Sequence, residues 1–288
     1  MTATPPVALT IAGSDSGGGA GIQADLVTFA ALGVHGASVL TALTAQNTVG
    51  VAGVHVPPVD FLQAQLDAVL GDLPIAAVKT GMLATEPVVQ AVAAVAAAGR
   101  LPRLVVDPVL VSSTGARLLD PGAERAYAEV LFPHALVVTP NAREAAALVG
   151  GSVDTAADAR AAARELAALG PRWVVVKGGH QVDDGDEGGA SAEAVDIVYE
   201  SATGSVTELR RPRVPTRNDH GTGCTFAAAT AALLAGGAPV PEALAAAKQF
   251  VHEGLVASAG WRLGDGHGPV GKLGGWRVRG PAPPAATG

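Results

Sequence analysis

The chain has 288 residues, of which 49% are hydrophobic and 16% are charged, and it carries a formal net charge of −7. This length predicts a single domain over residues 1–280 ahead of a disordered tail at 281–288, and the acidic balance, without a Lys- or Arg-rich run, excludes nucleic acid as a partner. A single cysteine excludes an internal disulfide, and the lack of a basic leader or of ~20 consecutive apolar residues predicts a cytoplasmic protein that does not enter a membrane.

Short runs rich in β-branched residues alternate with alanine- and leucine-rich stretches of helical length. Strands are predicted at Val7–Ala12, Ala37–Leu43, Ile75–Thr80, Leu104–Asp107, Leu136–Thr139 and Trp173–Lys177. Helices are predicted at Gly21–Leu32, Asp60–Leu70, Glu86–Ala98, Ala142–Val149, Thr155–Leu169 and Thr225–Ala235. Several strand runs are apolar at successive positions, which is typical of a parallel sheet buried on both faces. The alternation predicts a doubly wound α/β fold, mostly parallel, with helices on both faces.

Two regions interrupt this alternation. Asp183–Ala190 is acidic and glycine-rich, so we expect an exposed loop there. Val195–Glu200 and Ser205–Arg210 are predicted to form an antiparallel hairpin at the sheet edge. In open α/β sheets the ligand lies beyond the carboxyl ends of the strands, so the residues that follow each strand are the candidates for function.

The first predicted strand runs into a glycine-rich segment at residues 13–21, GSDSGGGAG. Glycine allows the backbone to approach a ligand closely, although the spacing matches neither the dinucleotide-binding nor the P-loop pattern. A flexible turn into the next helix remains the alternative. Asp25 borders the apolar face of that helix, and its residue type leaves capping, surface and ligand-contact roles open.

Gln46 and Met82 follow the second and third predicted strands. The Gln46 amide offers a donor and an acceptor, which suit a ring nitrogen beside an exocyclic amine. Met82 can pack against a flat heterocycle. For each residue taken alone, the alternative is an ordinary loop amide or a core side chain.

Oxygen ligands and a lysine follow the next three strands. Asp107 and Glu144 satisfy the modest needs of Mg²⁺, which uses one or two carboxylates in phosphoryl-transfer sites. Asn141 can instead cap the following helix, with Glu144 completing a capping box. Lys177, followed by glycine, suits a phosphate, and a snorkelling surface lysine is the alternative.

The segment Asn218–Cys224, NDHGTGC, directly precedes an apolar helix. Gly221 and Gly223 allow consecutive N–H groups to converge at the helix start, which predicts an anion site for a phosphoryl group. The same field is expected to lower the pKa of the Cys224 thiol, which makes Cys224 a candidate base. An inert buried cysteine is the alternative.

Taken together, the motifs resemble the hydroxymethylpyrimidine and phosphomethylpyrimidine kinases of the ribokinase-like superfamily, from about Val7 to about Leu273. The matching segments, in order, are GSDSGGGAGIQADL, LTAQNT, KTGML, VVDPV, TPNAREA, VKGGH and HGTGC. Single pieces are shared with pyridoxal kinases and sugar kinases, whereas the combination is specific. Ser14 and Ser16 occupy positions that vary in the family.

The resemblance implies ATP and Mg²⁺ as cofactors, a homodimer, and two successive phosphorylations on the way to thiamine. Gln46 would pair with the aminopyrimidine, helped by Gly13, Asp25, Met82 and the backbone near Thr44. The nucleotide and the metal would contact Asp107, Asn141, Glu144, Lys177 and Lys248. Residues Gly221, Thr222, Gly223 and Cys224 would form the anion hole, with Cys224 as base.

Three alternatives remain at this point. A pyridoxal kinase of the same superfamily is the nearest, and Gln46 is the residue that discriminates against it. A catalytically silent binding protein on the same fold is the second. A nicotinamide-dependent oxidoreductase is the third, and the glycine spacing argues against it.

Overall fold

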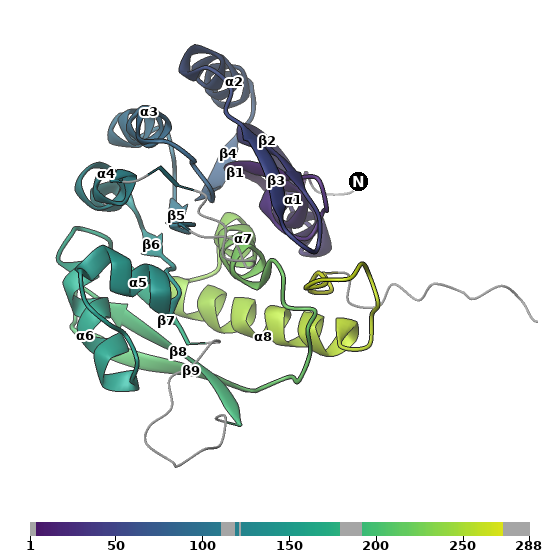
Figure 1. Cartoon of the computed structure of the whole chain (residues 1–288). Coiled ribbons are helices and arrows are strands. Elements are labelled where there is room, and N and C mark those ends of the chain that lie inside the picture. Colours follow the sequence, from purple (N-terminus) through teal and green to yellow (C-terminus); the bar gives the residue numbers. More distant parts are fainter. Residues whose placement is uncertain (1–3, 111–118, 121, 179–191, 273–288) are drawn as a thin grey trace, which may run out of the picture.

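A computed structural model describes residues 4–110, 119–120, 122–178 and 192–272. Within these residues one sheet of nine strands has the order β3-β2-β1-β4-β5-β6-β7-β8-β9 (Figure 1). Its strands are β1 Val7–Asp15, β2 His35–Gln46, β3 Val51–His55, β4 Ile75–Thr80, β5 Val105–Val106, β6 Val137–Val138, β7 Trp173–Lys177, β8 Glu193–Glu200 and β9 Ser205–Pro212.

The central strands β2, β1, β4, β5, β6 and β7 are parallel, so their carboxyl ends meet at one edge of the sheet. The outer strands β3, β8 and β9 run antiparallel to their neighbours. The predicted hairpin is therefore confirmed as β8 and β9, at the edge of a mostly parallel sheet.

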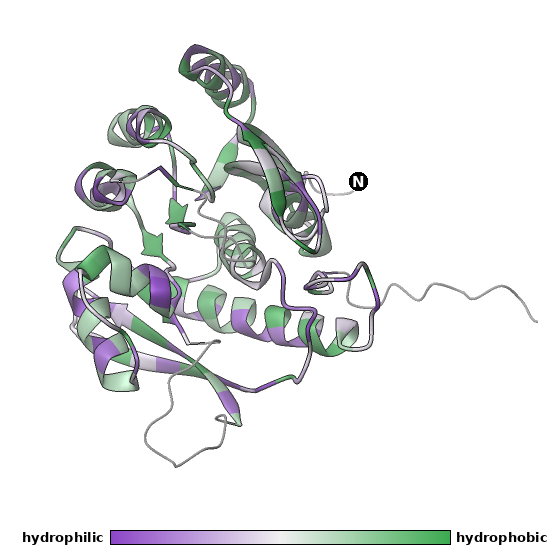
Figure 2. Ribbon diagram, viewed as in Figure 1, coloured by the Kyte–Doolittle hydropathy of each residue, from purple (hydrophilic) through white to green (hydrophobic). Residues whose placement is uncertain are grey.

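Helices cover both faces of the sheet. They are α1 Gly21–Ala31, α2 Val59–Asp72, α3 Glu86–Ala97, α4 Ala123–Ala126, α5 Ala142–Val149, α6 Ala156–Ala167, α7 Thr222–Ala235 and α8 Val240–Ser258. One face packs against α1, α7 and α8, and the other against α2 to α6, with a separate apolar core on each side. The helices turn their apolar residues toward the sheet (Figure 2). The doubly wound fold predicted from the sequence is confirmed.

Some elements differ from the expectation. Helix α7 begins at Thr222 rather than Thr225, because the turn is made by Gly221, whose φ of 82° is open to glycine. The sequence analysis assigned no element to β3 or to α8, although Pro241 in the first turn of α8 is a typical helix-start residue. The predicted loop at Asp183–Ala190 and the predicted tail at 281–288 lie outside the described residues. No helix in the described ranges is long and apolar enough to cross a membrane.

Candidate active site

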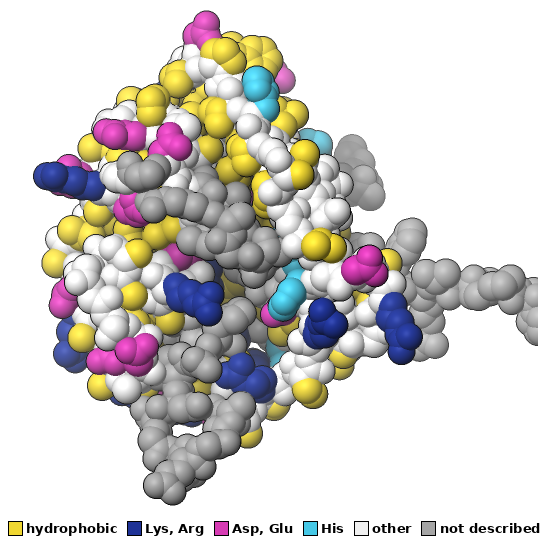
Figure 3. Space-filling model, in the orientation of Figure 1, with side chains coloured by type: hydrophobic (Ala, Val, Ile, Leu, Met, Phe, Trp, Pro, Cys, Tyr) yellow, Lys and Arg dark blue, Asp and Glu magenta, His cyan; other side chains and the backbone are white. Residues whose placement is uncertain are grey.

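A cavity of about 1060 Å³ opens at the carboxyl ends of the parallel strands. Its lining comes from the turn after β1, the end of β2, the residues after β4, β5 and β6, the end of β7 and the start of α7. In the space-filling view, basic and histidine side chains lie around the hollow in the middle of this face (Figure 3). Segments far apart in sequence thus share one site.

The glycine-rich turn after β1 is organised by the carboxylate of Asp15. Its Oδ1 accepts from Gly17 N (2.8 Å), and its Oδ2 accepts from Gly19 N (3.1 Å) and Ala20 N (2.8 Å). The same Oδ2 lies 2.9 Å from Nε2 of His220, just before α7. Burial alone would raise the pKa of Asp15, but the hydrogen bonds from His220 and the loop amides outweigh it and hold the pKa low. The segment is an ordered loop, not a flexible turn.

The residues predicted to hold the acceptor line one wall of the cavity. Gln46 ends β2, with its amide 3.2 Å from Thr44 Oγ1 and 3.4 Å from His220 Nε2. Across from it, a Cβ added to Gly13 would lie 3.1 Å from Sδ of Met82. Gly13, near the end of β1, therefore lies close to the methionine side chain. The wall offers one amide and an apolar surface.

Asp25 is placed differently from the other predicted acceptor residues. It has no exposed surface and is absent from the cavity lining. Its Oδ2 accepts from Thr10 Oγ1 (2.6 Å) and from Lys79 Nζ (2.8 Å). Burial would lower the pKa of Lys79, but the adjacent Asp25 carboxylate outweighs it and raises the pKa. Lys79 does line the cavity, and the sequence analysis missed it although a lysine inside an apolar strand run is unusual.

The opposite wall carries charge. Asp107 Oδ1, after β5, accepts from Lys177 Nζ (2.7 Å) and Thr139 Oγ1 (3.0 Å). Burial would lower the pKa of Lys177, whereas the Asp107 and Glu144 carboxylates raise it, with a net increase. The ammonium is therefore kept charged at the end of β7, and a snorkelling role for Lys177 is excluded.

Asn141 and Glu144 form a capping box at the start of α5. Asn141 Oδ1 accepts from Glu144 N (2.9 Å), and Glu144 Oε2 accepts from Asn141 N (2.8 Å). The structural alternative is thus confirmed, and both side chains also line the cavity. Burial raises the pKa of Glu144 to about 7, and Asp107 adds to the increase.

This donor set fits a magnesium ion. Within the described ranges no group of three or more His, Cys, Asp or Glu side chains is arranged to hold a metal, and Mg²⁺ needs only one or two carboxylates beside phosphate oxygens. Asp107 and Glu144 supply these carboxylates on one wall. Burial and the Asp107 charge raise the pKa of Glu144, and a divalent cation beside the two carboxylates would favour the ionised form of Glu144.

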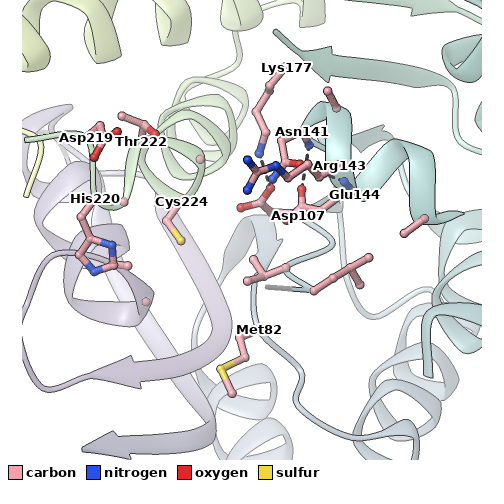
Figure 4. Close-up of a pocket in the computed structure, with 18 of the residues that line it drawn as sticks. Met82, Asp107, Asn141, Arg143, Glu144, Lys177, Asp219, His220, Thr222 and Cys224 are labelled. Carbon is pink, nitrogen blue, oxygen red and sulfur yellow. Dashed lines mark hydrogen bonds and ion pairs between the residues drawn. The ribbon is translucent and has the colours of Figure 1, made fainter. Parts of the chain in front are cut away.

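The first turn of α7 closes the cavity between the two walls (Figure 4). A Cβ on Gly223 would lie 3.0 Å from Lys177 Nζ and 3.7 Å from Asp107 Oδ2, so the turn abuts the charged wall. A Cβ on Gly221 would lie 2.0 Å from the Gly19 carbonyl oxygen, so it also abuts the glycine-rich loop. The first N–H groups of a helix have no partner within it. Thr222 N donates to Asp219 O (3.2 Å), and residues 221–224 line the cavity together with Lys177.

Cys224 lines the cavity in this first turn, but the expectation of a lowered thiol pKa was wrong. Burial raises the pKa, and the Asp25 and Asp107 carboxylates add to the increase. The Lys79 ammonium and the Gly21 N–H act in the opposite direction without prevailing. The loss of water and the neighbouring acids therefore outweigh the Lys79 charge and the Gly21 N–H.

Lys248 on α8 and Arg143 on α5 are two further basic residues, and only Arg143 of the two lines the cavity. Lys248, on α8, is largely buried in an ion pair with Asp196 (2.8 Å) and is absent from the cavity lining. Arg143, in the first turn of α5, lines the cavity and reaches toward Lys177 (Figure 4). The sequence analysis gave no role to Arg143, Asp15 or His220, although all three stand inside motifs that it had singled out.

Comparison with known proteins identifies the family. The model of a family described as phosphomethylpyrimidine kinase matches residues 15–271. The chain belongs to the phosphomethylpyrimidine kinase family. This confirms the resemblance inferred from the motifs and makes the protein a phosphotransferase.

Relatives in this family cover nearly the whole chain. A hydroxymethylpyrimidine/phosphomethylpyrimidine kinase of Rhizobium meliloti is 48% identical, over 92% of this chain and 96% of its own length. That of Streptomyces coelicolor is 48% identical, over 93% and 94%. A bifunctional thiamine biosynthesis protein of Geobacter sulfurreducens is also 48% identical, but this chain spans only 51% of it.

Solved structures share the fold. A pyridoxal kinase from Staphylococcus aureus, in complex with AMP-PCP and pyridoxal, has a TM-score of 0.84 at 36% identity, with 96% of each chain covered. A phosphomethylpyrimidine kinase from Clostridium difficile has a TM-score of 0.73 at 37% identity and covers 86% of this chain and 98% of its own. Kinases of this family and pyridoxal kinases thus share one architecture.

Proposed function

We propose that the protein transfers the γ-phosphoryl group of ATP to the hydroxymethyl group of 4-amino-5-hydroxymethyl-2-methylpyrimidine, and then a second one to the resulting monophosphate, in thiamine biosynthesis. The observation that carries the proposal is the position of the α7 turn. Through Gly221 it abuts the glycine-rich loop, with His220 just before it 3.4 Å from the Gln46 amide, and through Gly223 it abuts the wall with Asp107 and Lys177. A phosphoryl group at this turn is in reach of both walls.

The charged wall is the proposed nucleotide side. Lys177 and Arg143 would contact phosphate oxygens, and the N–H groups of the α7 turn would stabilise the charge that develops on the group in transfer. Asp107 and Glu144 would hold Mg²⁺, which when bound neutralises phosphate charge. Asn141 acts through the capping box, because it sets the position of Glu144.

The neutral wall is the proposed acceptor side. The Gln46 amide can donate to a ring nitrogen and accept from the adjacent exocyclic amine, so an aminopyrimidine satisfies both halves of it. Met82 and the Gly13 backbone would pack against the ring. Asp25 has no surface on the cavity, so we propose that it supports the site by holding Lys79.

Cys224 is the proposed base for the first transfer. The proton of the hydroxymethyl oxygen would pass to Sγ as that oxygen attacks phosphorus, and the thiolate is the form that accepts it. Because the thiol pKa is raised, the first step should accelerate with pH. The second acceptor is a phosphate oxygen, which is already ionised and needs little help from a base.

A coupled assay of ADP release across three acceptors tests the function. We expect turnover with hydroxymethylpyrimidine and with its monophosphate, each dependent on Mg²⁺. Pyridoxal is the second candidate acceptor, favoured by the likeness to pyridoxal kinases. A kcat/KM that is higher for pyridoxal than for both pyrimidines would overturn the proposal in favour of a pyridoxal kinase. Release of ADP with none of the three would favour the silent binding protein.

We further propose a cytoplasmic homodimer that binds neither nucleic acid nor membrane, with Lys248 as a more distant contributor to the nucleotide end. Exposed apolar side chains on β2, β3 and α2 support the dimer, since Leu43, Val54 and Phe61 are 44%, 46% and 59% exposed. Light scattering on the purified chain measures the mass in solution, and a monomer at micromolar concentration would exclude a stable dimer.

A further inference from the structure

The lysines of this chain are Lys79, Lys177, Lys248 and Lys272, and all of them are wholly or largely buried. Its exposed cationic side chains on the described surface are therefore arginines. An ammonium is compact and rotates freely, whereas guanidinium is wide and planar, so the two do not substitute for each other in a packed interior. The positions of the lysines thus single out places where the protein holds a small positive charge inside.

Lys272 differs from the other lysines. The others each contact a carboxylate, in the pairs Lys79–Asp25, Lys177–Asp107 and Lys248–Asp196. Lys272 is 7% exposed, and among the described residues its ammonium donates to two carbonyl oxygens, those of Gly19 (3.0 Å) and Val270 (3.2 Å). Burial accordingly lowers its pKa. A buried ammonium without a contacting counter-ion is costly, which indicates a role beyond stability.

The bond to Gly19 fixes the glycine-rich loop. Both backbone polar groups of Gly19 are hydrogen-bonded, because its N–H donates to the Asp15 carboxylate and its carbonyl oxygen accepts from the Lys272 ammonium. The same carbonyl oxygen would lie only 2.0 Å from a Cβ added to Gly221, so the loop and the α7 turn are in close contact there. Lys272 therefore determines how closely the loop approaches the first turn of α7.

The segment that carries Lys272 runs beside this turn. His220 N donates to Gly268 O (3.0 Å), and Val270 N donates to His220 O (3.1 Å). Further up the same segment, Gly266 N donates to Thr48 Oγ1 (3.2 Å). We name residues 266–272 the C-terminal strap. It joins the end of β2, the start of α7 and the glycine-rich loop.

The charge of Lys272 also acts on the site. The Cys224 thiol and the Asp25 and Asp15 carboxylates act electrostatically on the ammonium, which is absent from the cavity lining and is therefore not placed to touch a substrate. The charged groups that interact electrostatically with the Cys224 thiol are Lys79, Lys177, Lys272, Asp25 and Asp107. Among the described residues, Lys272 is the one of these cations that contacts no carboxylate.

We propose that Lys272 is a positioning residue for phosphoryl transfer, which holds the glycine-rich loop against the α7 turn and adds positive charge behind the anion site and the Cys224 sulfur. This rests on the proposed function only for the choice of acceptor. Lys272→Met removes both the hydrogen bond and the charge. Lys272→Gln keeps an N–H donor for Gly19 and removes the charge alone.

Two measurements test the proposal. For Lys272→Met we expect kcat to fall about tenfold or more with both acceptors, at little change in KM for ATP. We expect iodoacetamide to alkylate Cys224 several-fold more slowly at pH 8, because the thiolate loses a nearby cation. Lys272→Gln should recover part of kcat while alkylation stays slow.

Thr48→Val is the matched control, because it removes another side-chain hydrogen bond of the strap, from Gly266 N, without changing charge. We expect it to retain near wild-type kcat and alkylation. Equal slowing of alkylation in Thr48→Val and Lys272→Met, or no change in Lys272→Met, would overturn the proposal. If Lys272→Met does not fold, as judged by thermal unfolding, the comparison of Lys272→Gln with Thr48→Val decides. Alkylation needs no substrate, so it is independent of whether the pyrimidines are turned over.

Discussion

The two walls of the cavity are held together by different means. The acceptor wall is organised by backbone hydrogen bonds, since the Asp15 carboxylate accepts from three amides of the glycine-rich loop. The side chains that it presents, Gln46 and Met82, are neutral. The nucleotide wall is organised by charged side chains, with Asp107 bonded to Lys177 and adding to the raised pKa of Glu144.

This difference between the walls shows how one site can bind two chemically different ligands. A neutral ring is recognised by shape and by the paired donor and acceptor of one amide, so this wall can present neutral side chains to its ligand. A polyphosphate is recognised by charge, so the wall carries cations and carboxylates. Changes on the acceptor wall should alter which acceptor is used, and changes at the nucleotide wall or the shared α7 turn should lower turnover with every acceptor.

The largest effect is expected at the α7 turn. Gly223→Val places carbon atoms against Lys177 Nζ and in front of the helix N–H groups. We expect kcat to fall by about 10³-fold with both pyrimidines, because the anion site serves both steps. Steady-state ADP release measures this. Gly236→Ala at the other end of α7 is the control, where the nearest atom would be 3.4 Å away. A loss confined to one acceptor would contradict a shared anion site.

The next effect separates the two steps. Cys224→Ala should slow transfer to the hydroxymethyl group by about 10²-fold and transfer to the monophosphate much less. Because the pKa of the Cys224 thiol is raised, kcat of wild type on the alcohol should increase with pH above neutrality, and this increase should be absent in the variant. Equal losses on both acceptors would remove Cys224 from the role of base.

A smaller effect is expected on the acceptor wall. Gln46→Leu should lower the ratio of kcat/KM for hydroxymethylpyrimidine over pyridoxal by about 10- to 100-fold, because a lost amide leaves the polar edge of the aminopyrimidine unpaired. Turnover of pyridoxal serves as the internal control for folding. An unchanged ratio would show that Gln46 does not select the ring.

The smallest effect concerns stability and tests the metal site. Glu144 has its pKa raised from 4.5 to about 7 by burial and by Asp107, so the folded state binds the proton more tightly than the unfolded state. This favourable contribution is present below pH 4.5 and is lost as pH rises to about 7. Glu144→Gln keeps the capping box and should be more stable than wild type above pH 7, by up to about 3 kcal/mol.

Urea unfolding across this pH range, with and without Mg²⁺, makes the measurement. Mg²⁺ should restore stability to wild type at pH 8 and have less effect on the variant, because the ion takes the place of the proton. A magnesium effect of the same size in both proteins would place the ion elsewhere.

The sequence predicted the fold well where local pattern and burial agree. Consecutive apolar residues in β1 and β4 indicated a buried parallel sheet, and the glycine-rich segments indicated the edge at which the cavity opens. The predictions made for Asp25 and Cys224 failed for physical reasons. The position of Asp25 on α1 could not show that its carboxylate forms an ion pair with Lys79 of β4. The N-terminal position of Cys224 indicated a low thiol pKa, whereas burial raises it, helped by acids on α1 and directly after β5.

The interior location of every lysine has a practical consequence. A lysine-specific endoprotease has no accessible cleavage site on the described surface, since its target side chains are buried in the sheet, in α8 and at the end of the strap. Cleavage then requires the chain to open, so digestion rates at low protease concentration would report how often the native molecule unfolds. Saturating nucleotide should slow digestion, and the degree of protection would give its affinity without any catalytic readout.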